Sequence, residues 1–298
     1  MEKILITGVG GFIGKELASA LAGEGYKVYG TSKSQIKLNN IIVHNANILD
    51  GKKIIQVCKN MDYVIHCAAV TEYRNISDFP IESLKTNVIG TYNVLKAFAK
   101  SNAKSFIFPS SGKVYGKPNY LPYNEEHSKN PNTSLGKMKE ICEELITYFS
   151  DFSDKSFFIL RLFNVYGQHQ KKYFLIPTIL SQINEKKILL GDIKSKRDFI
   201  YIKDVIDCFS KIIKNNKKGI QIYNVGSGIS HSAYEIVSII SRLKNKKFEI
   251  ELYKPKLRKN EAFEERSNIR KLKNIGWKPK YSLEDGLNEM IKPKQRIN

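Results

Sequence analysis

A glycine-rich loop close to the N-terminus has the residue types and the spacing of a dinucleotide-binding turn. Gly8, Gly11 and Gly14 follow a short apolar run and open a segment with helical periodicity. In such a loop the first glycine permits the tight turn, the second lets the backbone approach a pyrophosphate, and the third allows the helix to pack closely on the strand. The N–H groups at the helix start, at Phe12 and Ile13, would point at the phosphate oxygens. The loop therefore predicts bound NAD or NADP.

The residues after the second expected strand bear on which of these two cofactors is used. An acidic residue about twenty positions after the glycines accepts a hydrogen bond from the ribose 2′-OH of NAD, whereas a basic residue suits the 2′-phosphate of NADP. This chain has Ser32 and Lys33 in that stretch and no acid. A hydroxyl and an ammonium can hold a phosphate, which favours NADP or the use of both cofactors. The alternative is that Lys33 is an ordinary surface lysine.

Composition excludes several other kinds of protein. The chain has 298 residues, 42% hydrophobic and 26% charged, which is ordinary for a globular protein of one large domain or two small ones. No apolar stretch approaches the roughly 18 residues of a membrane-spanning helix, so we expect a cytoplasmic protein that does not enter a membrane. The cysteines lie far apart, without a CxxC pair or a histidine spacing suited to zinc, so we expect neither disulfides nor a metal: they are Cys58, Cys67, Cys142 and Cys208.

The chain is strongly basic, and this charge has two interpretations. Lys and Arg number 49 and Asp and Glu 29, which gives a formal net charge of +20. An anionic partner such as nucleic acid is one interpretation, and lysines scattered over a solvated surface are the other. The lysines are spread along the whole chain, and we find no RNA-binding, zinc or helix-turn-helix motif. We therefore expect no nucleic-acid partner.

The order of the expected elements predicts an α/β fold, a Rossmann doubly wound parallel sheet with a smaller α/β C-terminal domain. Short β-branched runs alternate with longer helix-period segments over the first 165 residues, as in a parallel sheet covered on both faces. We expect strands at 3–7, 27–31, 41–45, 63–67, 105–109 and 157–162, and helices at 12–22, 52–59, 82–100 and 135–149.

The remaining residues alternate less regularly. We expect strands at 188–190, 222–225 and 248–252, and helices at 233–243, 269–275 and 283–290. Asp204 is expected to cap a further helix that runs to Asn215. We assign residues 1–165, with about 192–220 packing back on them, to a dinucleotide-binding domain, and residues 166–191 and 221–298 to a substrate domain.

Several stretches, in order along the chain, resemble one family. Besides the glycine loop they are VIHCAA at 64–69, TNVIGT at 86–91, PSSGKVYG at 109–116, LRLFNVYG at 160–167, RDFIYIKDV at 197–205, YNVGSG at 223–228 and IGWKP at 275–279. Together they resemble the extended short-chain dehydrogenases/reductases, in particular the NAD(P)-dependent nucleotide-sugar epimerase/dehydratase group. The resemblance implies a nucleotide-diphosphate sugar as substrate, and a homodimer formed by the helices at 82–100 and 135–149. Their helix-period apolar residues permit that packing, although a stripe that faces the sheet has the same pattern.

The resemblance also implies roles for individual residues. Ser111 matches the catalytic Ser/Thr, and Lys139 matches the lysine that binds the nicotinamide ribose. Matching positions imply cofactor contacts at Asn47, Ile48, Ala68, Ala69 and Asn87, and substrate contacts at Asn164, Arg197 and Arg258. The match around Arg258 is partial, and Arg197 in a surface ion pair with Asp198 is the alternative for that residue.

One position departs from the family pattern, and it is the position of the proton-exchanging group. The family carries Tyr-x-x-x-Lys on a helix, and the matching stretch here begins with Leu135 and ends with Lys139. Leucine neither donates nor accepts a proton. Redox chemistry is lost, or another acid/base replaces the tyrosine, or the leucine is an introduced change. Candidate replacements are Glu72, Tyr73, Tyr115, His127 and Tyr166.

The resemblance leaves the reaction open between two enzyme classes. Gly112 and Lys113 follow Ser111, where a dehydratase of this family carries acidic residues, so dehydration is disfavoured. An epimerase that moves hydride off and back onto C4 of the sugar remains, as does a reductase of a 4-keto sugar. A sensor or scaffold that binds cofactor and nucleotide sugar without reacting them is the alternative from another class.

Overall fold

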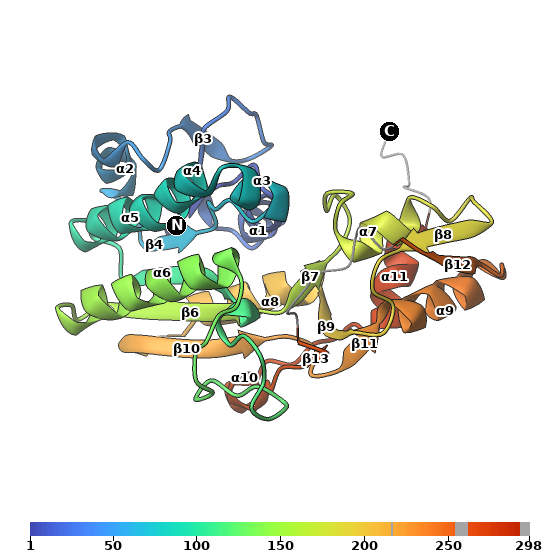
Figure 1. The fold of residues 1–298 in the computed structure, drawn as a ribbon. Coiled ribbons are helices and arrows are strands. Elements are labelled where there is room, and N and C mark those ends of the chain that lie inside the picture. The colour runs from blue at the N-terminus through green and yellow to red at the C-terminus, as the bar shows by residue number, and fades with distance from the viewer. Residues whose placement is uncertain (216, 254–261, 293–298) are drawn as a thin grey trace. The chain divides into compact units, whose positions relative to one another are not determined.

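The structure is a computed structural model that describes residues 1–215, 217–253 and 262–292 (Figure 1). The chain divides into two compact units. The first unit comprises residues 1–116, 125–162 and 206–224, and the second comprises residues 117–124, 163–205 and 225–298. Among the described residues, every helix is too short or too polar to span a membrane. All four cysteines are free thiols.

A seven-stranded sheet is the centre of the first unit. Its order is β10-β6-β5-β4-β1-β2-β3, and the strands from β1 to β6 pair in parallel. Because the chain starts in the middle and winds outwards in both directions, this is the predicted doubly wound arrangement. The strands are β1 Lys3–Thr7, β2 Lys27–Ser32, β3 Ile42–Asn45, β4 Tyr63–His66, β5 Ser105–Ser111, β6 Ser156–Leu162 and β10 Gly219–Val225.

Apolar residues on one face of this sheet form a large buried cluster with three helices. Leu5, Phe106 and Phe157 of the sheet contribute to it, and the helices are α2 Gly51–Cys58, α5 Gly90–Ala99 and α6 Ser134–Asp151. Neighbouring residues of a strand point to opposite faces, so Ile4 and Ile6 face the other side. The first unit also contains α1 Phe12–Gly23 and most of α8 Ile202–Ile213, which are joined where Ser210 donates a hydrogen bond to Glu24 (2.5 Å).

The single helix predicted over 82–100 is interrupted, so that prediction was wrong in detail. Residues Pro80–Leu84 form α4, Lys85–Ile89 form a π-helical turn, and α5 follows. The cause lies at Asn87, whose side chain accepts a hydrogen bond from the N–H of Val70 (2.7 Å) and donates one to its carbonyl (2.9 Å). A wide turn of this kind is common at functional sites, and the 3.6-residue period gives no sign of it. A short helix, α3 Tyr73–Asp78, precedes this segment.

The second unit is built around a strand that the sequence analysis did not predict. The strand β9 Lys196–Tyr201 pairs with β7 Asn164–Tyr166 and β13 Glu264–Glu265 in parallel and with β11 Ser230–Ser232 antiparallel. A separate parallel pair joins β8 Lys187–Leu190 to β12 Glu249–Leu252. The helices are α7 Leu175–Leu180, α9 Ala233–Lys244, α10 Arg270–Asn274 and α11 Leu283–Ile291.

Asp204 does not cap α8, which corrects the prediction. The helix begins at Ile202, and the buried carboxylate of Asp204 accepts hydrogen bonds from the N–H groups of Lys280 (2.8 Å) and Tyr281 (3.2 Å). The acidic residue therefore ties two distant segments of the second unit together. Sequence spacing alone cannot distinguish this use from a cap.

Candidate active site

The glycine loop between β1 and α1 has the geometry of a phosphate cradle. Gly8 has a φ of +68°, and a Cβ added to it would lie 2.6 Å from the Cα of Ala68. A Cβ at Gly14 would lie 2.4 Å from the carbonyl oxygen of Gly8, so only glycine fits at either position. The N-cap of α1 is Gly11, no side chain caps the helix, and its first turn holds no acid. The first N–H groups and the positive helix end therefore suit a pyrophosphate, as the sequence predicts.

A chain of hydrogen bonds connects this loop to the interrupted helix. The hydroxyl of Thr7 lies 3.2 Å from the N–H of Ala68 and 2.7 Å from Nδ1 of His66, and Nε2 of His66 lies 2.9 Å from the hydroxyl of Thr91. Thr91 donates its proton to the carbonyl of Asn87 (2.6 Å), so its oxygen must accept from Nε2. It follows that Nε2 carries the hydrogen and that Nδ1 accepts from Thr7.

This assignment requires a neutral imidazole at His66, and the burial of the ring agrees with it. Burial, together with the nearby Lys139 ammonium, lowers the pKa of His66 to about 3. The neutral ring joins β1, β4 and the interrupted helix. Ala68, Ala69 and Asn87, which were all predicted as cofactor contacts, lie directly on this chain or next to it.

Ser111 and Lys139 both belong to the region around the carboxyl end of β5. Ser111 is the last residue of that strand, and its hydroxyl accepts a hydrogen bond from the N–H of Lys113 (3.2 Å). The Lys139 ammonium is buried on α6, donates to the carbonyl of Pro109 (2.6 Å) and lies 4.2 Å from the centre of the Phe108 ring. Burial lowers the pKa of Lys139 from its usual value. Lys139 therefore contacts Phe108 and Pro109 of β5, the strand that ends at Ser111.

Leu135 lies in the first turn of α6, next to the segment that follows Ser111. Thr133 caps the helix by accepting the N–H of Gly136 (3.1 Å). A Cβ on Gly136 would lie 2.4 Å from the carbonyl of Lys113, so the glycine lets this turn pack directly on the 3-10 turn Gly112–Val114. The half-buried Leu135 side chain has no group that can exchange a proton.

Three of the five proposed replacements are engaged inside the protein. Tyr115 is buried, donates to Asn224 (2.6 Å) and accepts from Arg161 (2.9 Å), and burial raises the pKa of its hydroxyl to about 12. His127 is buried against the Tyr115 ring, and burial lowers its pKa. Tyr166 belongs to the second unit and donates to the carbonyl of Leu283 (3.3 Å).

The other two replacements lie at the start of α3. Tyr73 is 62% exposed, and Glu72 accepts a hydrogen bond from Asn75 (3.3 Å). Residues of α3 contact α6, the helix that carries Leu135. Among the five, these two therefore have the accessibility that proton exchange with a substrate requires.

The other predicted cofactor residues are divided between the loop and the core. Ser32 ends β2, accepts the N–H of Ser34 (3.2 Å), and lies next to Gly10, while Lys33 is exposed. Asn47 is exposed and accepts the N–H of Leu49 with its side chain. Ile48 is buried in the core cluster, so its side chain is used in packing.

The predicted substrate residues belong to the second unit. Arg197 is 9% exposed, donates to the carbonyls of Lys196 (2.9 Å) and Phe263 (3.4 Å), and its Nε lies 3.7 Å from a carboxylate oxygen of Glu265. Asn164 donates to the carbonyl of Asp198 (3.3 Å). The Asp198 carboxylate accepts hydrogen bonds from Ser227, Gly228 and Ser267. Arg258 lies outside the described residues.

Sequence reasoning missed the roles of Thr7, His66 and Thr91, and it missed an ion pair between Glu143 and Arg161 (2.7 Å) in which both side chains are buried. Spacing gave one usable sign, since Glu143 follows Lys139 by four residues and therefore lies on the same face of a helix. Nothing in the sequence indicated that this face is buried against charged residues of the sheet.

The low pKa of His66 predicts how stability changes in acid. Between pH 6.5 and about 3 the unfolded chain binds a proton at this residue and the folded chain does not, so stability falls as the pH falls through that window. The contribution is at most about 1.4 kcal/mol per pH unit. We expect a His66→Gln variant to be less stable at pH 7.5 but to lose stability less steeply down to pH 4. Urea unfolding at a series of pH values measures this, and parallel curves for the two proteins would contradict it.

Comparison with known proteins gives a consistent set of relatives. The model of the NAD dependent epimerase/dehydratase family matches residues 4–226. A Methanocaldococcus jannaschii protein whose name provisionally assigns it as a UDP-glucose 4-epimerase is 31% identical over 97% of both chains. GDP-6-deoxy-D-mannose reductase of Pseudomonas aeruginosa is 26% identical, with 97% of this chain and 96% of the relative covered. The structure of UDP-glucuronic acid 4-epimerase from Bacillus cereus, in complex with UDP-glucuronic acid and NAD, is 26% identical and covers 96% of this chain and 97% of its own, with a TM-score of 0.85.

Proposed function

The chain belongs to the NAD dependent epimerase/dehydratase family, and on this basis we propose that it catalyses NAD(P)-dependent oxidation or reduction at C4 of a nucleotide-diphosphate sugar. The observation that carries the proposal is the buried Lys139 ammonium bound to Pro109 near the carboxyl end of β5, the strand that ends at Ser111, at the same edge of the sheet as the glycine loop. Burying a cation costs free energy, and such buried charged groups are concentrated at functional sites. The proposed reaction centre is unusual in lacking the tyrosine.

The residues of the candidate site each have a defined task in this proposal. The bound cofactor supplies the site that takes up or releases a hydride. The N–H groups at the start of α1 bind its pyrophosphate, and the Lys139 ammonium binds a ribose hydroxyl. Ser111 forms a hydrogen bond with the oxygen at C4 of the sugar. Proton exchange at that oxygen falls to Glu72 or Tyr73, the accessible groups at the start of α3.

Between the two reactions, the residues near the glycine loop favour the reductase. A cofactor that is exchanged in every turnover suits a reductase, whereas an epimerase regenerates its own. Ser32 and Lys33, with no acid in that stretch, suit the 2′-phosphate of NADPH. Relatives named for each reaction are similar to this chain over nearly its whole length, so similarity supports both.

Leu135 also supports a second candidate function. A protein that binds cofactor and nucleotide sugar without reacting them needs the glycine loop and Lys139 but no proton-exchanging group. Such a protein would act as a sensor or a scaffold. Turnover separates the two candidates, because only the enzyme consumes substrate.

Restoring the tyrosine tests the reaction centre. Because Glu72 or Tyr73 exchanges the proton in this proposal, we expect Leu135→Tyr to turn over no faster than Leu135→Phe, whereas a gain of about 10²–10⁴-fold, the contribution of a positioned acid/base, would show a vacated site and contradict the assignment. The measurement combines the absorbance of reduced nicotinamide with chromatography of the nucleotide sugar. Leu135→Phe is the matched control, because it adds the ring without the hydroxyl. Equal rates for the two variants would mean that the position is not a vacated acid/base site.

Calorimetric titration tests the cofactor. We expect NADPH to bind more tightly than NADH, and Lys33→Ala to weaken NADPH binding by roughly tenfold, the worth of one charge-assisted hydrogen bond. NADH affinity should stay the same in that variant. Tighter binding of NADH by the unaltered protein would contradict the assignment.

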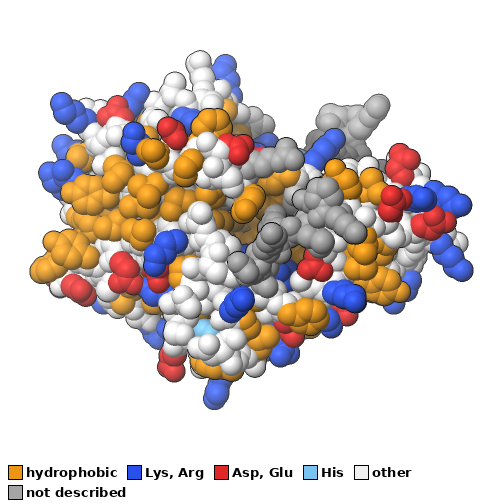
Figure 2. Space-filling view, in the orientation of Figure 1, with side chains coloured by type: hydrophobic (Ala, Val, Ile, Leu, Met, Phe, Trp, Pro, Cys, Tyr) orange, Lys and Arg blue, Asp and Glu red, His pale blue; other side chains and the backbone are white. Residues whose placement is uncertain are grey.

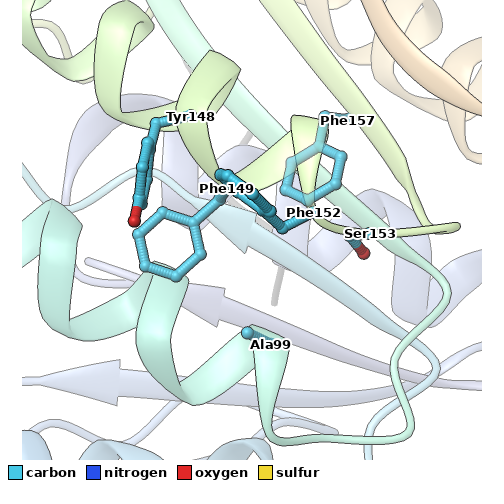
Figure 3. A pocket seen from close by; sticks show the side chains of 6 residues that line it. All are labelled: Ala99, Tyr148, Phe149, Phe152, Ser153 and Phe157. Atoms are coloured by element: carbon cyan, nitrogen blue, oxygen red, sulfur yellow. The ribbon is translucent and has the colours of Figure 1, made fainter.

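An exposed apolar face of the first unit supports the proposal of a homodimer. Figure 2 shows hydrophobic side chains gathered over α5 and α6, and large exposed members are Tyr92, Tyr148 and Phe152. A cavity of about 270 Å³ lies at the ends of these helices, lined by Ala99, Tyr148, Phe149, Phe152, Ser153 and Phe157 (Figure 3). Exposed apolar patches of this kind mark interaction surfaces. A second copy of the chain, packed through the same two helices, would cover the face.

Charge introduced on this face tests the dimer. We expect Tyr148→Lys combined with Phe152→Lys to give a monomer in sedimentation equilibrium at concentrations where the unaltered protein is a dimer. Burying two lysines in an apolar interface is strongly unfavourable. Tyr234→Lys, on an equally exposed tyrosine of α9, is the control and should remain a dimer. If the unaltered protein is monomeric at every concentration, the proposal of a homodimer is contradicted.

A further inference from the structure

Glu143 lies one turn after Lys139 on α6 and is almost completely buried. Its carboxylate accepts a hydrogen bond from the hydroxyl of Ser110 (2.6 Å) and two from Arg161, at 3.1 Å from Nε and 2.7 Å from Nη2. Ser110 lies on β5 directly before Ser111, and Arg161 lies on β6. One side chain of α6 is therefore bound to two neighbouring strands at the level of the candidate reaction centre.

Arg161 is itself held in place, so the anchor of Glu143 is rigid. Its Nη1 donates to the hydroxyl of Tyr115 (2.9 Å) and to the carbonyl of Glu125 (3.2 Å). Tyr115 in turn donates to Asn224 (2.6 Å), whose N–H donates to the side chain of Glu125 (2.8 Å). A buried ion pair persists only when its other hydrogen-bonding atoms are also satisfied, and here they are.

Glu143 is one of three residues that favour the charged form of Lys139. Burial lowers the pKa of Lys139, and Cys142, Cys67 and Glu143 act against that effect. Burial raises the pKa of both thiols, to about 12 for Cys67, so they are uncharged at neutral pH. His66 on β4 is uncharged as well. Of the three residues that act against burial, Glu143 alone is an anion. The cations that face it are Arg161 and Lys129, whose Nζ lies 3.9 Å from a Glu143 carboxylate oxygen.

We propose that Glu143 is a positioning residue for Lys139, fixing α6 against β5 and β6 so that the Lys139 ammonium keeps its place near the carboxyl end of β5. What the ammonium does there rests on the proposed function, whereas its placement and its charge do not. Glu143 touches neither substrate nor cofactor in this proposal. Glu143 acts on Lys139 in two ways: it holds the helix turn that carries both residues, and its negative charge favours the ammonium.

A double-mutant cycle on stability tests the coupling without any turnover. Glu143→Gln removes the charge and keeps the shape, and Lys139→Met removes the ammonium. We expect Glu143→Gln to lower Tm, and the loss to be smaller by about 2–4 °C when Lys139→Met is already present. Losses of Tm that simply add would show that Glu143 serves only Arg161 and the fold, and would overturn the proposal.

Kinetics and their pH dependence test the positioning. We expect Glu143→Gln to lower kcat by at least tenfold with less than a twofold change in KM, and to move the alkaline limb of the rate profile to lower pH. The direction follows because Lys139, without the carboxylate, loses its proton at lower pH. Glu144→Gln is the control on the adjacent exposed residue and should match the unaltered protein. An unshifted alkaline limb in Glu143→Gln would overturn the proposal.

If Glu143→Gln does not fold, Ser110→Ala is the alternative variant. It removes the hydrogen bond from β5 to Glu143 and keeps the ion pair with Arg161. A fall in kcat for Ser110→Ala supports the positioning role, and an unchanged kcat contradicts it. Absence of turnover in the unaltered protein with every nucleotide sugar and cofactor would refute the proposed function. The thermal cycle would still decide whether Glu143 acts on Lys139.

Discussion

Close contact between backbone segments at the carboxyl edge of the parallel sheet is the constraint on which the candidate site depends. A Cβ at Gly8 would overlap Ala68, and a Cβ at Gly136 would overlap the carbonyl of Lys113. The first contact brings the start of α1 beside the end of β4. The second brings the first turn of α6 beside the segment after Ser111. Both approaches need glycine, because any side chain would separate the segments by the width of at least a methyl group.

The polar groups in this region are buried, and their mutual satisfaction gives the site its rigidity. The strands β4, β5 and β6 are covered on both faces, so a polar side chain on them must find its partner within the protein. His66 does so between Thr7 and Thr91, and Glu143 does so with Arg161. Each arrangement joins elements that are distant in the sequence. Leaving one of these buried polar groups without a hydrogen-bond partner would cost free energy, so the elements stay in their relative positions.

Part of the large positive charge also has a structural use. Lys155 donates to the carbonyls of Phe98 and Ser101 at the end of α5, and Lys246 donates to three successive carbonyls, 183–185, after α7. Ammonium groups satisfy carbonyls that a helix end leaves without partners. Others form exposed ion pairs, such as Lys104 with Glu2, which contribute little to stability. These uses give some of the lysines that are spread along the chain a partner within the protein.

The sequence by itself determined the local features. Gly8, Gly11 and Gly14 identified the turn after β1, the alternation of apolar runs identified the doubly wound sheet, and Leu135 was visible as a departure from a motif. These could be predicted because they depend on residues that are near one another in the chain. The tertiary structure decided the rest. It placed Asp204 on a distant backbone instead of at a cap, interrupted the helix at Asn87, and buried Tyr115 and His127 away from solvent. Each outcome depends on a partner from a remote segment, and burial and pairing become defined only when those segments meet.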